Sequence, residues 1–320
     1  MQEIKVTANE AGQRLDKLLA KYLNEAPKSF LYKMLRKKNI VLNGKKATGN
    51  EKLVNGDSVK LFLADETIAK FSKSVIQKTK GTLEILYEDS DILMINKPVG
   101  MLSQKAETND VSVVEHLITY LLESRQLTEE NLRSFKPSIC NRLDRNTSGL
   151  LVCGKSLVGL QKMAEMFRER SMKKFYLCVV DGEITKPCDI KGYLVKDEKT
   201  NTVSIRKDMI PNGYPIETEY RPVKKLQHGT LLEVHLITGR THQIRAHLAS
   251  IGHPIVGDYK YGNAKVNKYY KEQYKLSSQF LHSFRLEMPK NIDGLKQLEG
   301  KTFEAPLPKK FQKIIESECI

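Results

Sequence analysis

A carboxylate between two arginines is the first group in this sequence that could do chemistry. The segment Asn141-Arg-Leu-Asp-Arg-Asn-Thr-Ser-Gly-Leu150 places Arg142 and Arg145 on either side of Asp144, and an apolar run follows. Nearby guanidinium groups stabilise the charged form of a carboxyl, so Asp144 should stay ionised and serve as a nucleophile or a base. The same residues could instead form a surface salt-bridge cluster that caps a turn.

A second polar cluster lies further along the chain, in Gly239-Arg-Thr-His-Gln-Ile-Arg245. Gly239 can end a strand, and Thr241 can begin a helix that continues to residue 250. On that helix Arg245 follows Thr241 by four residues and His242 by three, so the three side chains share one face. The helix could point Arg245 at the edge of a pocket, although an ordinary amphipathic helix would have the same pattern.

Several strands and helices must position these groups. Short apolar runs predict strands at residues 92–95, 149–152, 175–180, 230–235 and 280–284. Apolar residues at helical spacing predict helices at 157–168 and 241–250. Because the helices do not alternate regularly with the strands, the pattern favours an α+β fold over a repeated βαβ fold.

The composition indicates a soluble, basic protein with a polyanionic partner. The 320 residues include 53 Lys and Arg against 38 Asp and Glu, a net charge of +15 at pH 7. This excess favours a nucleic acid, although a basic surface that serves only solubility would give the same charge. No apolar run approaches the ~20 residues that span a bilayer, and the N-terminus lacks a signal-peptide core. We therefore expect no membrane association and a cytoplasmic location.

Cysteine and histidine usage argues against disulfides and metal sites. The five cysteines are odd in number and form no C-x-x-C pair, and the seven histidines show no ligand spacing. Glycine loops that bind phosphate are also missing from the sequence. We expect neither a metal ion nor a cofactor.

Positive charge is concentrated near the N-terminus, where seven basic residues and no acid lie between residues 26 and 50. Two short amphipathic helices and Asn-Gly turns between short strands are predicted there. Residues 12–64 resemble the S4 RNA-binding domain, and residues 65–82 are expected to be a linker to a domain at 83–320. The resemblance implies contacts with RNA backbone, although a solvated helix face would look alike. The implied contacts come from Lys33, Arg36, Lys37 and Lys38.

The rest of the chain resembles the RluA family of pseudouridine synthases. Five segments agree with that family in order along the chain: Asn96-Lys97-Pro98-x-Gly100, Arg142 to Gly149, Lys174-Phe175-Tyr176, Gly239 to Arg245, and Gly252 to Asp258. The family has a histidine where this chain has Asn141. An asparagine can still donate and accept hydrogen bonds, but it cannot titrate as an imidazole does.

The resemblance implies a fold and a reaction. The fold would be α+β, with a mixed, mainly antiparallel sheet. The enzyme would isomerise uridine in RNA by breaking the N1–C1′ bond, rotating the base and rejoining it through C5, without a cofactor. Asp144 would be the nucleophile, Arg245 would pair with it, and Tyr176 would stack on the uracil. Arg142 would fill the space left by the flipped base or hold its phosphate. Lys97 would bind substrate by shaping the pocket rim, although a plain strand-ending turn would explain it equally well.

The expected substrate is large-subunit (23S) ribosomal RNA, because relatives with an S4 domain usually modify it. Transfer RNA is the other candidate, and we expect a monomer. Two rival functions stay open at this point. One is a non-catalytic RNA-binding or ribosome-assembly factor. The other is an enzyme that hydrolyses a nucleoside or glycoside, which would normally need a second carboxylate beside Asp144.

Overall fold

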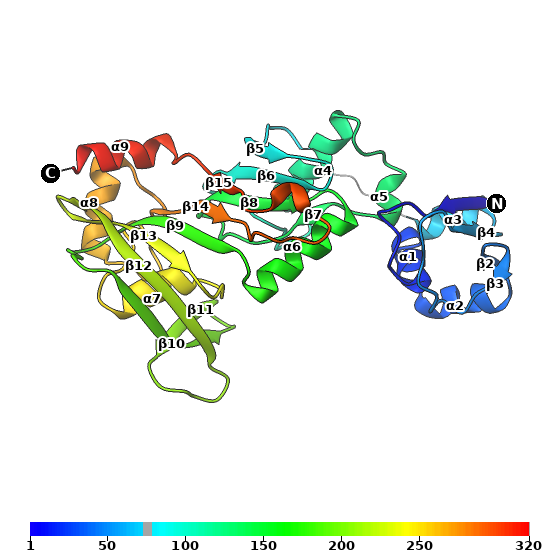
Figure 1. Cartoon of the computed structure of the whole chain (residues 1–320), viewed down its shortest axis with the longest axis horizontal. Coiled ribbons are helices and arrows are strands. Elements are labelled where there is room, and N and C mark those ends of the chain that lie inside the picture. The colour runs from blue at the N-terminus through cyan, green and yellow to red at the C-terminus, as the bar shows by residue number, and fades with distance from the viewer. Residues whose placement is uncertain (73–78, 320) are drawn as a thin grey trace.

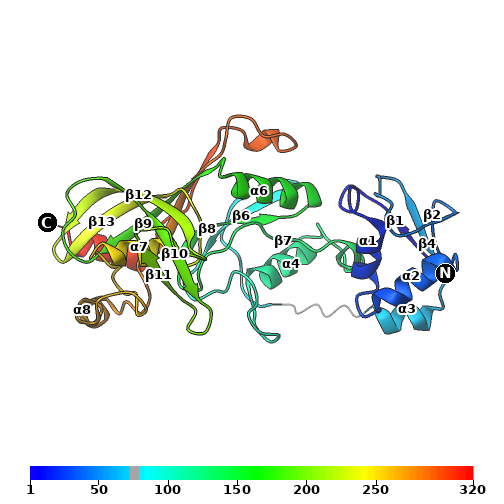
Figure 2. The same cartoon turned by 90° about the horizontal axis from the view of Figure 1, so that it is seen from below.

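The computed structural model describes residues 1–72 and 79–319, which form two units with separate sheets (Figure 1). A small N-terminal unit lies at one end of the elongated molecule (Figures 1 and 2). Helices α8 (Ala264–Tyr274) and α9 (Lys309–Ser317) lie at the other end. The larger unit contains both of the polar clusters found in the sequence.

The small unit pairs four short strands antiparallel, in the order β1-β4-β2-β3. On α1, Leu15, Leu18 and Leu19 are fully buried, as their i, i+3, i+4 spacing requires of one helix face. The elements of this unit are β1 (Gln2–Lys5), α1 (Leu15–Tyr22), α2 (Lys28–Arg36), β2 (Ile40–Leu42), β3 (Lys45–Lys46), β4 (Ser58–Leu61) and α3 (Asp65–Phe71).

The small unit extends beyond the expected range 12–64 on both sides. Strand β1 pairs with β4 along its whole length. The expected linker, 65–82, begins with helix α3, whose Ile68 is buried in the same apolar cluster as α1 and α2. A seven-residue helix with one buried side chain has too little periodicity to be recognised in the sequence. Residues 73–78 of the expected linker lie outside the described residues.

The large unit is built on an eleven-stranded sheet in which the main path runs β11-β10-β12-β13-β9-β14-β8-β6-β5. Its strands are β5 (Ile85–Glu88), β6 (Ile92–Lys97), β7 (Ser138–Ile139), β8 (Ser148–Gly154), β9 (Lys173–Val180), β10 (Cys188–Asp197), β11 (Thr202–Arg206), β12 (Tyr214–Leu226), β13 (Gly229–Leu236), β14 (Leu281–Glu287) and β15 (Thr302–Glu304). Its helices are α4 (Val113–Glu123), α5 (Asn131–Ser134), α6 (Leu157–Glu169), α7 (Gln243–Ser250), α8, the 3₁₀ turn η1 (Lys296–Leu298) and α9.

The sheet is mixed and mainly antiparallel, with β8 and β14 as its parallel pair. The α+β class is therefore confirmed. The five strands expected from the sequence correspond to β6, β8, β9, β13 and β14, and the expected helix at 157–168 corresponds to α6.

The central strands are buried on both faces, which explains their continuous apolar runs. On β6, Leu93 and Ile95 pack in the cluster that includes α4, whereas Ile92 and Met94 pack in the cluster that includes α6. Helices α4 and α6 therefore cover opposite faces of the sheet. The two helices bury β8 from both sides and hold it in place. The turn that carries Asp144 lies directly before β8.

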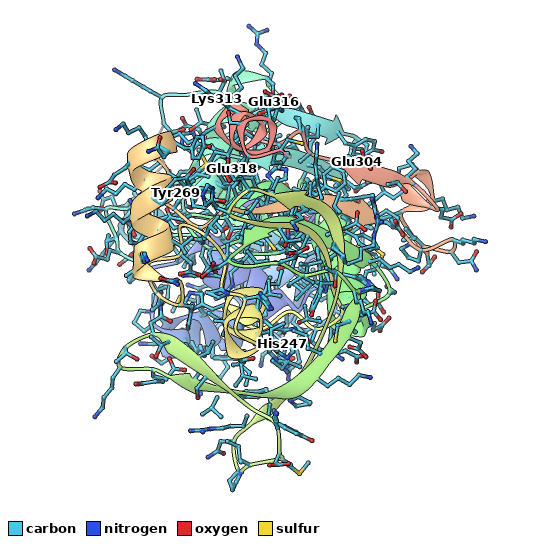
Figure 3. All side chains as sticks on the ribbon, turned by 90° about the vertical axis from the view of Figure 1, so that its left-hand side faces the viewer. His247, Tyr269, Glu304, Lys313, Glu316 and Glu318 are labelled. Carbon is cyan, nitrogen blue, oxygen red and sulfur yellow. The ribbon has the colours of Figure 1, made fainter. Side chains whose placement is uncertain are left out.

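A buried carboxylate ties the C-terminal segment to the large unit (Figure 3). Glu318 follows α9 and is 1% exposed. It accepts hydrogen bonds from Tyr269 (3.0 Å) and Tyr274 (2.8 Å) of α8, and from the backbone N–H of His228 (3.0 Å). Because the charge is satisfied by several donors, its burial is tolerated, and it holds α9 against α8 and the β12–β13 turn.

Candidate active site

Asp144 lies in the turn between β7 and β8, and hydrogen bonds fix both sides of this turn. The Thr147 N–H donates to the Asp144 carbonyl (3.0 Å). The Leu143 N–H donates to Ser103 Oγ (3.0 Å), which in turn donates to the Leu143 carbonyl (2.7 Å). The Asp144 side chain stays 27% exposed, so its carboxylate is held in place but open to a ligand.

Arg245 joins Asp144 to a second, buried carboxylate. Its Nη1 donates to Asp144 Oδ2 at 2.8 Å, while Nε and Nη2 donate to the two oxygens of Asp258 at 2.7 and 2.9 Å. Asp258 is 0% exposed and also accepts the backbone N–H groups of Lys260 and Tyr261. Burial opposes the charge of Asp258, but these donors, with Arg245 first among them, hold its pKa below its usual value. The guanidinium plane is fixed, and its free edge faces Asp144.

His242 is another titratable neighbour of Asp144. Its Nε2 lies 3.8 Å from Asp144 Oδ2, and its Nδ1 lies 3.0 Å from the hydroxyl of Tyr261. Burial lowers the pKa of His242, which favours the neutral ring. The expected helix start at Thr241 is wrong, because His242 is the N-cap of α7 and has a left-handed backbone with φ 54°. The Gln243 side chain accepts the Arg240 N–H at this end of the helix.

Asp144, His242 and Arg245 line a cavity of about 900 Å³. Tyr176 enters it from β9 and is 7% exposed, and burial raises the pKa of its hydroxyl to about 12. Arg142 is exposed and also lines the cavity. Most charged side chains around the cavity are cationic: Arg142, Arg145, Arg168, Arg170, Lys174, Lys196, Arg240, Arg245 and Lys260.

Lys97 is not at the pocket rim, so the expected role in substrate binding is wrong. It is 0% exposed, and its Nζ donates to the carbonyls of Pro98 (3.0 Å), Met101 (2.8 Å) and Arg145 (3.1 Å). Burial lowers its pKa to about 7. Lys97 therefore fastens the loop after β6 to the turn that carries Asp144, and sequence alone could not distinguish this buried lysine from an exposed one.

The four basic residues expected to bind RNA lie in the small unit. Lys33 and Arg36 are exposed on α2, and Lys37 and Lys38 are exposed directly after it. None of the four lines the cavity. The structure thus separates the predicted cations into a remote basic helix and a basic cavity rim.

Two comparisons with known proteins decide the family. Residues 91–250 match the family described as RNA pseudouridylate synthase. The chain is also 32% identical to "Ribosomal large subunit pseudouridine synthase C" of Vibrio parahaemolyticus, over 98% of this chain and 96% of that protein. The protein of the same name from Escherichia coli K12 is 32% identical over 98% of this chain and 95% of its own.

The chain belongs to the RNA pseudouridylate synthase family. It is therefore an isomerase that converts uridine to pseudouridine. Two solved structures share the fold, namely human RNA pseudouridylate synthase domain containing 4 and domain containing 1. The first has a TM-score of 0.57 at 21% identity, covering 73% of this chain and 92% of its own. The second has a TM-score of 0.55 at 22% identity, covering 73% and 86%.

Asn141, which stands where the family has a histidine, has a structural role in this synthase. Its Oδ1 accepts the backbone N–H of Val152 on β8 at 2.8 Å, and the Cys140 N–H donates to the Val152 carbonyl at 2.7 Å. The amide thus extends the pairing of β7 with β8 up to the turn that carries Asp144. This bond needs only an acceptor, so it does not require a titrating ring.

Two groups that hold the site were not predicted from the sequence. Asp258 is part of a recognised segment, but nothing in that segment shows that its carboxylate faces an arginine of α7. Ser103 has no motif at all and is recognised only by its two hydrogen bonds to Leu143. Among the residues that the structure describes, no three His, Cys, Asp or Glu side chains form a group that could hold a metal ion, and no helix is long and apolar enough to cross a membrane.

Proposed function

We propose that this synthase isomerises specific uridines of large-subunit ribosomal RNA, with Asp144 as the nucleophile. One observation carries the proposal: a part-exposed carboxylate, paired with a fixed arginine, opens into a cavity whose other charges are cationic. Such a cavity attracts a phosphodiester chain and presents the carboxylate to a nucleoside inside it. The relatives named as ribosomal large subunit pseudouridine synthases, matched over nearly the full chain, support ribosomal over transfer RNA.

The geometry supports a separate role for each neighbouring residue. Arg245 holds the Asp144 carboxylate in place through a charge-assisted hydrogen bond of 2.8 Å. Tyr176 offers a ring for the uracil to stack on. With a hydroxyl pKa of about 12 it is neutral at pH 7, so it can donate a hydrogen bond or pass on the proton that leaves C5. Arg142 lies exposed at the rim, where it can occupy the space that the flipped base leaves.

We also propose that the small unit is an S4-like RNA-binding module. Its exposed cations on and after α2 can neutralise phosphates without reading sequence. The module would hold a part of the RNA remote from the target uridine, and the large unit, from residue 79 onward, would carry the chemistry. We further propose that the synthase acts as a monomer in the cytoplasm, where ribosomal RNA is modified.

Pseudouridine mapping tests the proposed function directly. Ribosomal and transfer RNA from a strain that lacks the gene are incubated with the purified protein, and carbodiimide-dependent stops of reverse transcription locate the product. We expect stops at a few uridines of large-subunit RNA with the wild type. Stops on transfer RNA alone would overturn the proposed substrate, and no stops on any RNA would overturn the enzyme.

Asp144→Asn tests the nucleophile, because it keeps the size of the side chain and removes its charge. We expect no product, while the dissociation constant for RNA stays within a few-fold of the wild type. If binding is lost together with activity, Asp144 is a structural residue. Release of free uracil by the wild type would instead indicate a hydrolase, since an isomerase returns the base to the same ribose.

A further inference from the structure

Lys174 is a residue of a recognised motif that the proposed reaction does not use. It lies two residues before Tyr176 on β9, and side chains two residues apart on a strand point to the same face. Both line the same cavity. Two residues of a strand span about 7 Å, so the two side chains leave β9 roughly one nucleoside length apart.

Lys174 lies in a part of the cavity where the cations have no carboxylate partner. Within the described residues, Lys174, Arg170 and Arg240 form no salt bridge, whereas Lys196 and Arg168, also on the cavity wall, each pair with a glutamate. Burial and the neighbouring Arg170 lower the pKa of Lys174 to about 8. A half-buried lysine beside an arginine is disfavoured in its charged form unless an anion joins it.

The backbone around Lys174 leaves room for such an anion. A Cβ at Gly239 would lie 3.8 Å from the Lys174 Nζ, so the glycine keeps the space beside the ammonium free. Arg170 ends α6 in a left-handed conformation, with φ 59° and ψ 29°, where glycine is the favoured residue. An arginine at this position tolerates backbone strain and places a second cation beside Lys174.

We propose that Lys174 and Arg170 bind the phosphodiester next to the target uridine, and so set how deeply the nucleotide enters the cavity. This inference rests on the proposed function, because it takes the base to lie on Tyr176. The two cations then act on the backbone of the flipped nucleotide itself, whereas the cations of α2 act on RNA elsewhere. Both are positioning residues, since neither reaches the bonds that change.

The test is a double-mutant cycle between protein and RNA. Short RNAs carry the mapped uridine with a neutral methylphosphonate in place of the 5′ or the 3′ phosphate, and a third RNA carries it several nucleotides away. Dissociation constants are measured in the Asp144→Asn background, so that binding does not depend on turnover. With Lys174 present, we expect one flanking methylphosphonate to weaken binding by about tenfold or more, the cost of losing a hydrogen bond to a charged group.

Lys174→Met should weaken binding of the unmodified RNA by a similar factor and should make the methylphosphonate nearly harmless, because the two changes remove one contact. Lys174→Arg should restore most of the affinity. The remote methylphosphonate should weaken binding by the same factor whether residue 174 is Lys or Met. The inference is overturned if Lys174→Met leaves the methylphosphonate penalty unchanged at both flanking phosphates.

Arg170→Gly provides a second variant that does not risk the fold, because glycine relieves the left-handed backbone. We expect its melting temperature to equal or exceed that of the wild type while the methylphosphonate penalty shrinks. Lys313→Met on α9 (Figure 3) is an equal change of charge at an exposed residue that does not line the cavity, and it should change neither the melting temperature nor the methylphosphonate penalty. If the loss of affinity caused by the methylphosphonate is unchanged in Arg170→Gly, Arg170 does not bind the phosphodiester. Product mapping with the wild type is independent of these results and tests the reaction alone.

Discussion

Arg245 contacts two carboxylates that differ in their exposure and in the number of hydrogen bonds they accept from it. Asp258 is fully buried and takes two of its donors, whereas Asp144 takes one and stays part-exposed. A guanidinium fixed by one carboxylate can therefore position the other without immobilising it. We therefore infer that Asp258 is a positioning residue, which would act on the proposed reaction through Arg245.

Asp258→Asn should separate positioning from binding. The amide cannot accept two charged hydrogen bonds, so Arg245 loses its fixed plane, and we expect the single-turnover rate to fall about 100-fold. The dissociation constant for RNA should change by a few-fold at most. The melting temperature should also fall, because the buried Arg245 loses one of its two charged partners. A normal single-turnover rate in this variant would show that Asp144 does not depend on the orientation of Arg245.

Buried histidines should make the fold sensitive to acid. His282 is 0% exposed, contacts Ser148 Oγ through Nδ1 (2.9 Å) and the Ala305 carbonyl through Nε2 (3.1 Å), and has its pKa lowered by burial to about 4. The unfolded chain binds this proton near pH 6.5 and the folded chain only near pH 4, so stability is complete above pH 6.5 and falls as the pH drops towards 4.

We expect the melting temperature to decrease across this window, and His282→Gln to flatten the decrease. The glutamine will itself lower the melting temperature at neutral pH. The quantity to compare is therefore the slope of the melting temperature against pH, and not the melting temperature at one pH. His247, with its pKa also lowered to about 4, supplies the residual slope (Figure 3). An equally steep decrease in His282→Gln would contradict this assignment.

The sequence predicts the residues at the centre of the proposed site better than the residues that support them. The pair of Asp144 and Arg245 follows from the resemblance, although 101 residues separate the partners. The support depends on burial, which one sequence does not reveal: Lys97 looks like a rim lysine and is a buried donor to three carbonyls. Ser103 and Asp258 are ordinary polar residues until the fold brings them to the site.

At the scale of elements, the parallel pair β8–β14 holds the turn that carries Asp144 to the rest of the sheet. Gly149 lies at this pairing with φ 108°, and a Cβ there would lie 2.1 Å from the Ser283 carbonyl oxygen. The strands approach this closely because the residue has no side chain. The motif glycine after Asp144 is thus explained by strand packing.

Gly149→Ala should destabilise the protein by about 3 kcal/mol or more, because the new methyl group forces the two strands apart. Gly252→Ala is the matched control: its φ is 86°, but a Cβ there meets no atom within 4 Å. It should cost only about 1–2 kcal/mol of backbone strain. Equal costs for the two variants, measured by urea unfolding, would show that the close approach to β14 is not what requires glycine.

The ends of helices and strands are where local sequence patterns predict the structure least well. Long apolar strands such as β6 and β8 are found easily, because burial on both faces leaves a continuous run. The start of α7 is misplaced because the fold holds His242 in a left-handed conformation beside Asp144, against the preference of a capping threonine. Helix α3 is missed because its burial depends on the small unit as a whole.

At the scale of the whole molecule, direct contacts connect the two units. The guanidinium of Arg133, on α5, lies 3.9 Å from the ring centroid of Tyr22 on α1. Ser134 donates to Glu10 at 2.7 Å, and the Leu157 N–H donates to Asn9 at 3.2 Å. These contacts hold the basic helix α2 at a set place relative to the cavity, so an RNA bound by both must be long enough to reach across.

Changing Lys33, Arg36, Lys37 and Lys38 together to Gln should weaken RNA binding and flatten its dependence on salt. Four lost phosphate contacts should reduce the slope of log K against log salt by roughly 3. The single-turnover rate at saturating RNA should not change, because none of the four lines the cavity. The matched control neutralises four exposed lysines at the opposite end, Lys265, Lys268, Lys271 and Lys309. An equal loss of slope in the control would mean that the net charge, and not α2, binds the RNA.

The two carboxylates around Arg245 leave the interior of the site with one negative charge in excess, while the rim is cationic. We therefore expect the potential to change sign between the mouth and the interior of the cavity. A nucleotide is polar in the same sense, with an anionic backbone and an uncharged base. The field should reject a nucleotide that enters phosphate first and accept one that enters base first, so that entry is oriented before any hydrogen bond to the uracil forms.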